Sequence, residues 1–291
     1  MFDGFLQYIQ LEKRYSLHTV EAYQTDLHQF ADFLSIDSEQ VLIKTTSRDI
    51  RSWLVSLVES NLTNRSVNRK LASLRTYFKY LQKEGEISES PMKRINGPKN
   101  EKRLPIFAKE SELAPEKIAP LFTEDFDGKR DALMVELFYQ TGIRLSELIN
   151  LTTNNVSTDH IKVLGKRNKE RLIPISNKLS QQINSFLNTR DTQQITSNFL
   201  LTLENGRKMY PQFVYRKINA YLSQATTLDK TSPHVLRHTF ATHMLNRGTG
   251  LETLKDLLGH ANLSATQVYT HNSFAQLTSI YSQAHPRGHK S

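Results

Sequence analysis

The chain has 291 residues, a length that favours about two domains of ordinary size. Its formal net charge of +9 indicates a polyanionic partner, either nucleic acid or a membrane surface. With no Cys, no apolar run of membrane-spanning length and no signal-peptide pattern, the sequence excludes disulfides and thiolate zinc sites, and we expect a cytoplasmic protein that does not enter a membrane.

Residues 1–88 predict a small all-helical domain, because apolar residues recur at helical spacing in four successive segments. The second segment starts after Ser16, the third after Ser47, and the fourth at Thr63 or Asn64, all residue types that cap helices. The fourth segment has a clear apolar stripe, formed by Val67, Leu71, Leu74, Phe78 and Leu81.

The polar face of this fourth helix is basic and carries no acidic residue. Its six cations are Arg65, Arg69, Lys70, Arg75, Lys79 and Lys83. Solvated helix faces usually mix charges, so a nucleic-acid contact is favoured over a merely solvated face. The residues predicted to contact DNA are Asn64, Arg65, Asn68, Arg69 and Lys70, of which the two amides offer hydrogen bonds to phosphates or base edges.

Residues 89–105 contain three prolines, one glycine and five basic residues. This composition predicts an extended linker between two domains. A basic linker could follow a DNA backbone, and a plain hinge is the alternative.

Residues 106–291 predict a second domain that mixes helices with a short sheet. A helix over 126–139 ends near Gly142, and another begins at Arg144. Further helices are expected over 178–188, 210–224 and 235–246. His160–Leu164 and Arg171–Ile175 predict a β-hairpin whose connecting turn, residues 165–169, is basic.

Four short sequences in this domain carry chemically active side chains. They are TGIRLSEL at 141–148, GKRNKER at 165–171, HVLRHTFATHML at 234–245 and LLGHANLSATQVYTH at 257–271. Together they contain arginines, histidines and a tyrosine, residue types able to make and break a phosphodiester bond without a metal ion. Arg144 and Arg237 in particular offer planar forks that match two phosphate oxygens each.

In order and spacing, these four sequences resemble the tyrosine recombinase, or phage-integrase-like, family, and within it the Xer-type site-specific recombinases. The resemblance covers essentially the whole chain. It implies a mainly α fold with a small antiparallel sheet, made of an N-terminal helical, SAM-like core-binding domain and a C-terminal catalytic domain that ends in an exchange helix.

The resemblance also implies a role for each active side chain. Tyr269 is the expected nucleophile, Lys166 the general acid toward the departing 5′-oxygen, and His234 and His260 contact the scissile phosphate and assist proton movement. Arg144 and Arg237 are expected to bind the non-bridging oxygens.

The turn at 165–169 departs from the family's usual pattern. Arg167 stands where the family usually has glycine, which makes the turn bulkier and more cationic. Because Lys169 and Arg171 lie close to Lys166, the identity of the acid is open. Arg167 and Lys169 are also predicted to contact DNA.

Each remaining assignment has a structural alternative. Arg144 could pair with Glu147 on its own helix, and His234 and His238 could be core histidines bonded to the backbone. Tyr269 is one of 11 tyrosines and is singled out by its spacing from His260. No HExxH-like pattern or cluster of carboxylates accompanies the histidines, so we expect no metal and no cofactor.

The last helical stretch predicts a partner. Phe274, Leu277, Ile280 and Tyr281 form a short apolar stripe that needs a receiving groove. In the similar family this segment docks on the neighbouring protomer of a homo- or hetero-tetramer on two DNA duplexes, and packing within the same chain is the alternative.

The resemblance implies a site-specific recombinase that acts on a double-stranded recombination site through a 3′-phosphotyrosyl link and a Holliday junction. An Xer-type role would be chromosome-dimer resolution with a partner recombinase and a septal DNA translocase. An integrase or transposase of a mobile element, a catalytically inactive DNA-binding relative and a metal-dependent nuclease are the alternatives.

Overall fold

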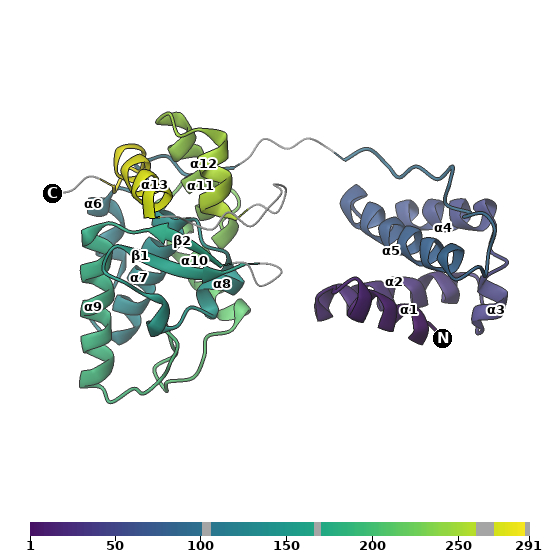
Figure 1. Ribbon diagram of the computed structural model, residues 1–291, viewed down its shortest axis with the longest axis horizontal. Helices are drawn as coiled ribbons and strands as arrows, with labels where there is room; N and C mark the ends of the chain where they lie inside the picture. The colour runs from purple at the N-terminus through teal and green to yellow at the C-terminus, as the bar shows by residue number, and fades with distance from the viewer. Residues whose placement is uncertain (101–105, 166–169, 260–270, 289–291) are drawn as a thin grey trace. The chain divides into compact units, whose positions relative to one another are not determined.

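The chain folds into two separate units, each with its own apolar core (Figure 1). The computed structural model describes residues 1–100, 106–165, 170–259 and 271–288. The first unit comprises Met1–Arg103 and the second Leu104–Ser291. Over the described residues the chain is mostly helical, and its sheet is a single antiparallel pair of strands, which confirms the predicted fold class.

The first unit is all helical. Its elements are α1 (Asp3–Gln7), the π-helical turn η1 (Tyr8–Glu12), α2 (Leu17–Phe33), α3 (Glu39–Leu42), α4 (Ser47–Glu59) and α5 (Asn64–Lys83). Ser16 and Thr63 accept backbone hydrogen bonds and cap α2 and α5. Helix α4 is capped by Thr46 and not by the expected Ser47, because Thr46 and Asp49 form a reciprocal capping box.

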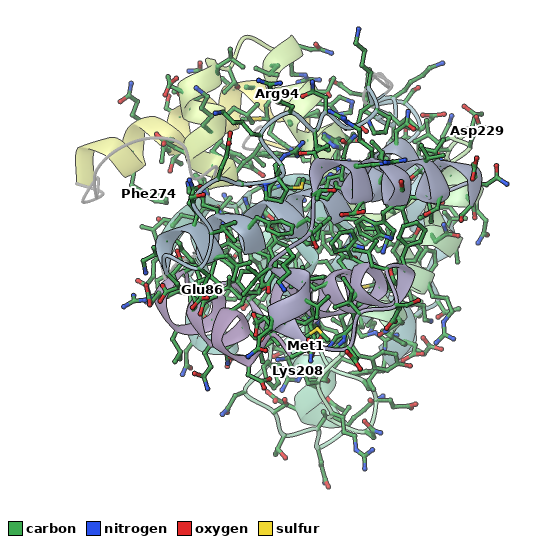
Figure 2. The ribbon with its side chains drawn as sticks, turned by 90° about the vertical axis from the view of Figure 1, so that its right-hand side faces the viewer. Met1, Glu86, Arg94, Lys208, Asp229 and Phe274 are labelled. Atoms are coloured by element: carbon green, nitrogen blue, oxygen red, sulfur yellow. The ribbon has the colours of Figure 1, made fainter. Side chains whose placement is uncertain are left out.

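Helix α5 fills the centre of this unit. All five residues of its predicted apolar stripe are buried, and they pack with residues of α2 and α4. Phe30 of α2 and Trp53 of α4 meet in the same core, with ring centroids 4.9 Å apart. Figure 2 shows side chains filling the space between these helices. The opposite face of α5 remains at the surface, where its polar residues were predicted to act.

The segment that follows α5 belongs to the first unit as far as Asn100. Met92 and Ile95 are buried in the core of that unit, and Arg75 donates to the backbone oxygen of Ile95 at 2.7 Å. Arg94, between them, is exposed (Figure 2). Met92 and Ile95 of the predicted linker therefore pack onto the first unit, while the division between the two units, after Arg103, falls within the predicted linker of residues 89–105.

The second unit carries the hairpin and the remaining helices. Its elements are α6 (Pro115–Ile118), η2 (Ala119–Leu121), α7 (Phe126–Thr141), α8 (Leu145–Ile149), η3 (Thr153–Asn155), β1 (His160–Leu164), β2 (Glu170–Pro174), α9 (Asn177–Thr192), α10 (Pro211–Ala225), α11 (Pro233–Asn246), α12 (Leu251–Leu258) and α13 (His271–Ala284). Helix α7 is buried along most of its length and packs against α9 and α11.

The hairpin forms in the predicted region, with its second strand beginning one residue earlier than expected. His160 pairs with Pro174, and Leu164 pairs with Glu170. Ile161 and Val163 alternate with more exposed neighbours and enter the core, as expected for a strand with one buried face. Gly165, the first residue of the predicted basic turn, follows β1 directly, and residues 166–169 lie outside the described residues.

Helix α13 packs within its own chain. It contacts β2 and α11, and Leu277, Tyr281 and Ala284 are buried in the core of the second unit. Phe274 is partly buried, and its ring lies edge-on to His160 with centroids 5.2 Å apart. In this single chain the alternative reading of the tail, packing in cis, is the one observed.

Candidate active site

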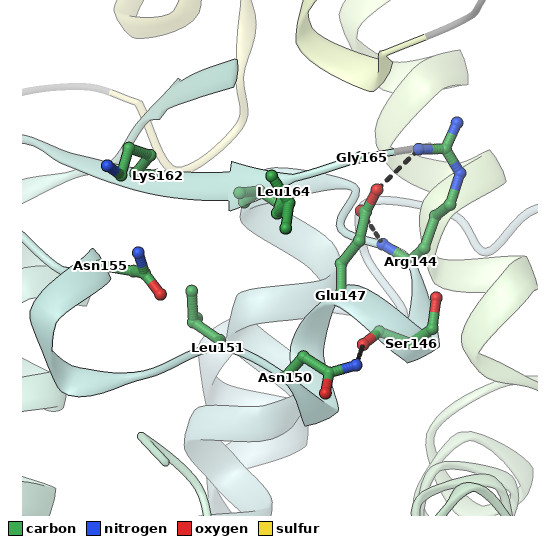
Figure 3. A pocket seen from close by; sticks show the side chains of 10 residues that line it. Arg144, Ser146, Glu147, Asn150, Leu151, Asn155, Lys162, Leu164 and Gly165 are labelled. Atoms are coloured by element: carbon green, nitrogen blue, oxygen red, sulfur yellow. Dashed lines mark hydrogen bonds and ion pairs between the residues drawn. The ribbon is translucent and has the colours of Figure 1, made fainter. Parts of the chain in front are cut away.

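Arg144 is held at the start of α8 by a tight turn. Helix α7 ends at Gly142, whose φ of 58° is left-handed and suits glycine. The chain then turns into Arg144, which precedes α8. Its backbone N–H donates to Glu147 Oε2 at 2.8 Å, and its Nη1 donates to Glu147 Oε1 at 2.7 Å (Figure 3). The pairing with Glu147 that the sequence offered as an alternative is therefore present, and the Arg144 side chain stays 28% exposed.

Glu147 is a buried carboxylate that a second arginine also holds. Arg171 of β2 donates from Nη1 to Oε1 at 2.9 Å and from Nη2 to Oε2 at 2.8 Å, and both side chains are 5% exposed. Burial alone would raise the pKa of Glu147. The hydrogen bonds and charge of Arg171, with those of Arg144, outweigh burial and lower this pKa to about 2. Glu147 is thus ionised at any pH at which the protein works.

Arg237 reaches the same place from α11. Its guanidinium is buried and donates to the backbone oxygens of Gly142 and Leu258, the latter at 2.8 Å. Burial is the largest cause that lowers the pKa of Arg237, to about 9, and repulsion from Arg144 and Arg171 adds to it. Arg144 and Arg237, 93 positions apart in sequence, lie in one cluster, because they donate to the adjacent backbone oxygens of Gly259 and Leu258.

The C-terminal end of α12 receives all three arginines. Arg171 Nε donates to the oxygen of Leu257 at 2.9 Å, Arg237 to Leu258 at 2.8 Å, and Arg144 Nη2 to Gly259 at 3.0 Å. Carbonyls in the last turn of a helix have no intrahelical partner, so they are natural acceptors for cations. Three guanidinium groups, those of Arg144, Arg171 and Arg237, therefore gather at this helix end, and two of them also bind the carboxylate of Glu147.

His234 lies one turn before Arg237 on α11. Ser232 caps this helix and Pro233 occupies its first position. His234 is exposed and its ring packs edge-on against His238, with centroids 4.5 Å apart. A spacing of three places His234 and Arg237 on neighbouring parts of one helix surface. His234 is therefore not the core histidine that the alternative reading described.

The buried histidine of α11 is His243, which the sequence did not single out. It is 3% exposed and lies between the hydroxyl of Tyr139 at 3.1 Å and the backbone oxygen of Ala108 at 3.0 Å. It joins α11 to α7 and takes no part in the arginine cluster.

Several predicted residues lie outside the described residues. They are Lys166, Arg167, Lys169, His260 and Tyr269. The described elements on either side bracket them in sequence: β1 and β2 flank the first three, and α12 and α13 flank the last two.

A cavity of about 300 Å³ opens beside Arg144, between α8 and β1 (Figure 3). Its polar lining includes Ser146, Asn150, Asn155 and Lys162. It adjoins Gly165, the last described residue before the predicted basic turn. Arg144, Glu147 and Gly165 thus line one cavity, together with the apolar side chains of Leu151 and Leu164.

The predicted DNA-contacting face of α5 is only partly available. Lys70 is 8% exposed and bonds Asp26 at 3.0 Å and also Gln29, so its predicted contact with DNA is corrected to an internal role between α5 and α2. Arg69 forms a two-pronged pair with the same fully buried Asp26, at 2.5 and 2.7 Å, yet keeps 47% of its side chain exposed. Arg65 is exposed.

The two asparagines of this face bind the chain that follows. Asn64 Nδ2 donates to the backbone oxygen of Lys99 at 2.9 Å, and Asn68 Nδ2 donates to that of Pro98 at 2.7 Å. Both amides thus hold residues 98–100 along α5. Their predicted contact with DNA would have to coexist with these bonds or replace them.

Within the described ranges, no group of three or more His, Asp or Glu side chains is arranged to hold a metal ion. In the same ranges, no helix combines the length and apolar character needed to cross a bilayer.

Both units match family models. Residues 113–276 match the model of the phage integrase family, and residues 2–85 match that of the phage integrase N-terminal SAM-like domain. A helical SAM-like unit joined to a unit with clustered arginines defines a DNA strand-exchange enzyme of the tyrosine recombinase class. The chain belongs to the phage integrase family.

Relatives of this chain include named tyrosine recombinases. A protein named tyrosine recombinase XerC from Staphylococcus haemolyticus is 38% identical over 291 residues, covering 98% of this chain and 97% of the relative. A protein of the same name from Staphylococcus aureus is 38% identical over 293 residues, covering 99% and 97%. The chain is therefore a tyrosine recombinase with XerC-like relatives along nearly its whole length.

Solved structures share the fold at low identity. The XerH site-specific recombinase bound to its palindromic difH substrate has a TM-score of 0.72 at 21% identity, covering 93% of this chain and 81% of that one. A lambda integrase tetramer bound to a Holliday junction has a TM-score of 0.67 at 14% identity, covering 91% and 79%. Recombinases of this fold have thus been captured on DNA.

Two residues that matter to the site, Glu147 and Arg171, were not among the predicted site residues. Glu147 could have been found, because a carboxylate three residues after Arg144 at a helix start is a capping pattern. Arg171 could not, because its partners lie 24 and 86 positions away in sequence.

Proposed function

We propose that this recombinase forms a 3′-phosphotyrosyl link with DNA through Tyr269, and that Arg144 and Arg237 bind the scissile phosphate. The observation that carries this assignment is the convergence of both arginines, from α8 and α11, on the end of α12. A phosphate suits this pair, because each guanidinium can donate to two of its oxygens.

The reaction is a transesterification that conserves bond energy. The phenolic oxygen of Tyr269 gives its proton to one of the two histidines, His234 or His260, and attacks phosphorus. The bond between phosphorus and the 5′-oxygen breaks, and Lys166 gives a proton to that oxygen. Negative charge gathers on the non-bridging oxygens, where Arg144 and Arg237 meet it. The 5′-hydroxyl of a partner strand then attacks the phosphotyrosine, which rejoins the DNA and restores the tyrosine.

The histidines complete the assignment. The exposure of His234, one turn before Arg237 on α11, supports its assignment to the same phosphate. His260 follows Gly259 directly in sequence, and therefore follows the carbonyls that hold the three arginines. Both histidines are assigned to phosphate contact and proton movement.

DNA binding and assembly involve both units. Arg65 and Arg69 on α5 are assigned to the DNA backbone, with Lys70 now excluded, and Arg167 and Lys169 to the DNA near the cleavage point. We assign the assembly to a homo- or hetero-tetramer on two duplexes, in which α13 leaves its own chain for a neighbour. The lambda integrase tetramer bound to a Holliday junction, which shares the fold, supports the tetramer, and the exchange of α13 is part of the proposal.

Chromosome-dimer resolution is the cellular role we favour, since the curated relatives named XerC align along almost the entire chain. This role would involve a second recombinase and a septal DNA translocase. An integrase of a mobile element remains the second candidate, because integrases share the fold.

One experiment tests the chemistry. The protein is incubated in EDTA with a nicked duplex that carries a site selected from DNA of the organism that encodes it. We expect a covalent adduct with wild type and none with Tyr269→Phe, which should still shift the DNA. An adduct that requires added metal, or one that persists in Tyr269→Phe, would contradict the proposal, and DNA binding without any adduct would identify an inactive relative.

A second experiment tests the cellular role. Deleting the gene should leave unresolved chromosome dimers in a fraction of dividing cells, and the wild-type gene, but not Tyr269→Phe, should restore resolution. Normal dimer resolution in the deletion strain would favour the mobile-element role.

A further inference from the structure

Arg171 is buried at the centre of the site and uses its whole guanidinium there. Its two terminal nitrogens bind both oxygens of Glu147, and its Nε donates to the oxygen of Leu257. It thereby joins three elements that are distant in sequence: β2, α8 and the end of α12. A side chain that is 5% exposed and fully engaged in this way is not available to DNA.

The partners of Arg171 also hold the phosphate-binding arginines. Glu147 bonds both the backbone N–H and the Nη1 of Arg144, and the carbonyls next to Leu257 receive Arg237 and Arg144. Without Arg171, Glu147 would lose two of its charged donors and could turn toward Arg144. The end of α12 would lose one of the three arginine hydrogen bonds to its backbone oxygens.

We infer that Arg171 is a positioning residue, which acts through Glu147 and the end of α12 to aim Arg144 and Arg237 at the scissile phosphate. This inference rests on the proposed function of those two arginines and adds to it a third arginine that never touches DNA. The bidentate fork and the Nε bond require a guanidinium, so Lys should not replace it.

The alternative is that Arg171 only stabilises the fold. The second unit contains another buried arginine, away from the site, that serves as a control. Arg190 at the end of α9 is 4% exposed, like Arg171, and donates to the backbone oxygens of Ser197, Phe199 and Leu200. It ties a loop and contacts neither Glu147 nor Arg144. Arg190→Lys therefore reports the effect of weakening a buried arginine away from the site.

The test compares single-turnover formation of the covalent adduct in wild type, Arg171→Lys and Arg190→Lys, at a temperature where all three are folded. We expect Arg171→Lys to slow adduct formation by about tenfold to a hundredfold, as misplaced catalytic groups do, with DNA affinity within about threefold of wild type. Arg190→Lys should keep the wild-type rate. Equal rates in wild type and Arg171→Lys, or equal losses in both variants, would overturn the inference.

A second measurement distinguishes an effect of Arg171 on the phosphate-binding arginines from an effect on the proton donor in the turn next to β2. When sulfur replaces the 5′-bridging oxygen of the substrate, the leaving thiolate needs no proton, because a thiol is far more acidic than an alcohol. A defect in the lysine turn next to β2 should vanish on this substrate, whereas a defect in phosphate binding should persist. We expect the Arg171→Lys defect to persist, and full rescue by sulfur would contradict the inference.

Glu147→Gln completes the experiment. If Arg171 acts through Glu147, the double variant should be no slower than the slower single variant, because both changes disable one unit. If the rate losses of the two single variants multiply in the double variant, Arg171 does not act through Glu147. The absence of any adduct with wild-type protein would instead refute the proposed function itself, so the two failures can be told apart.

Discussion

Tyr281 and His285 stack almost in parallel at the end of α13, with ring centroids 5.1 Å apart and 13° between the ring planes. Both are buried, at 2% and 0% exposure. Nδ1 of His285 accepts from the backbone N–H of Arg287 at 3.0 Å, and Nε2 lies 3.2 Å from the backbone oxygen of Tyr139. His285 is thus a neutral ring that fastens the end of α13 to α7.

This arrangement predicts a loss of stability in mild acid. Burial is the main cause that lowers the pKa of His285, to about 3, well below its ordinary value of 6.5. The unfolded chain therefore binds a proton that the folded chain does not, so the stability is complete above about pH 6.5 and falls as the pH decreases toward 3. We expect His285 to account for about 2 kcal/mol of the stability lost between pH 7 and pH 5.

Chemical denaturation at these two pH values measures the loss, with His285→Gln as the control. Gln can keep both hydrogen bonds but does not titrate, so its stability should depend less on pH than that of wild type. His243 also has a pKa lowered mainly by burial and is left in place in both proteins. The same pH dependence in both proteins would contradict the prediction.

A second prediction separates two basic residues of α5. Arg65→Ala should leave stability unchanged and should lower the slope of log affinity for DNA against log salt by about 1, because one phosphate contact is lost. Lys70→Ala should leave that slope unchanged and should destabilise the first unit by about 1–3 kcal/mol, because buried Asp26 loses a charged donor.

Salt-dependent DNA binding and thermal unfolding of both variants test this pair. An unchanged salt slope in Arg65→Ala would remove the start of α5 from the DNA interface. A reduced slope in a stable Lys70→Ala variant would return Lys70 to the interface.

Local features of the site could be predicted from the sequence, because they depend on neighbours in the chain. The apolar stripe of α5, the hairpin and the position of Arg144 at a helix start all follow from spacing and capping. Pairing between Arg144 and Glu147 also follows, since the two are three residues apart. The clustering of Arg144 with Arg237 was expected from a family resemblance and from no local rule.

Non-local partners account for what could not be predicted. Nothing in the spacing of the basic face of α5 shows that Lys70 turns toward Asp26, 44 positions earlier on α2. Met92 and Ile95 are isolated apolar residues in a stretch rich in proline and charge, so composition indicated a linker where the fold uses them as part of a core. In sequence, Arg171 is the first residue of a predicted strand beside a basic turn, and nothing there indicates that the folded chain directs it inward to Glu147.

The last prediction concerns Gly259, which ends α12 with a φ of 63°. A Cβ there would lie 3.2 Å from Cδ and Nη1 of Arg171, whereas a Cβ on Gly248, whose φ is 87°, would meet nothing within 4 Å. Each Ala variant should lose about 1–2 kcal/mol from the left-handed backbone. Only Gly259→Ala should also displace Arg171, and we expect it to slow adduct formation by about tenfold or more. Thermal unfolding and single-turnover cleavage measure the two effects. Equal rates in both variants would mean that the end of α12 tolerates a shift of Arg171 without disturbing Arg144 or Arg237.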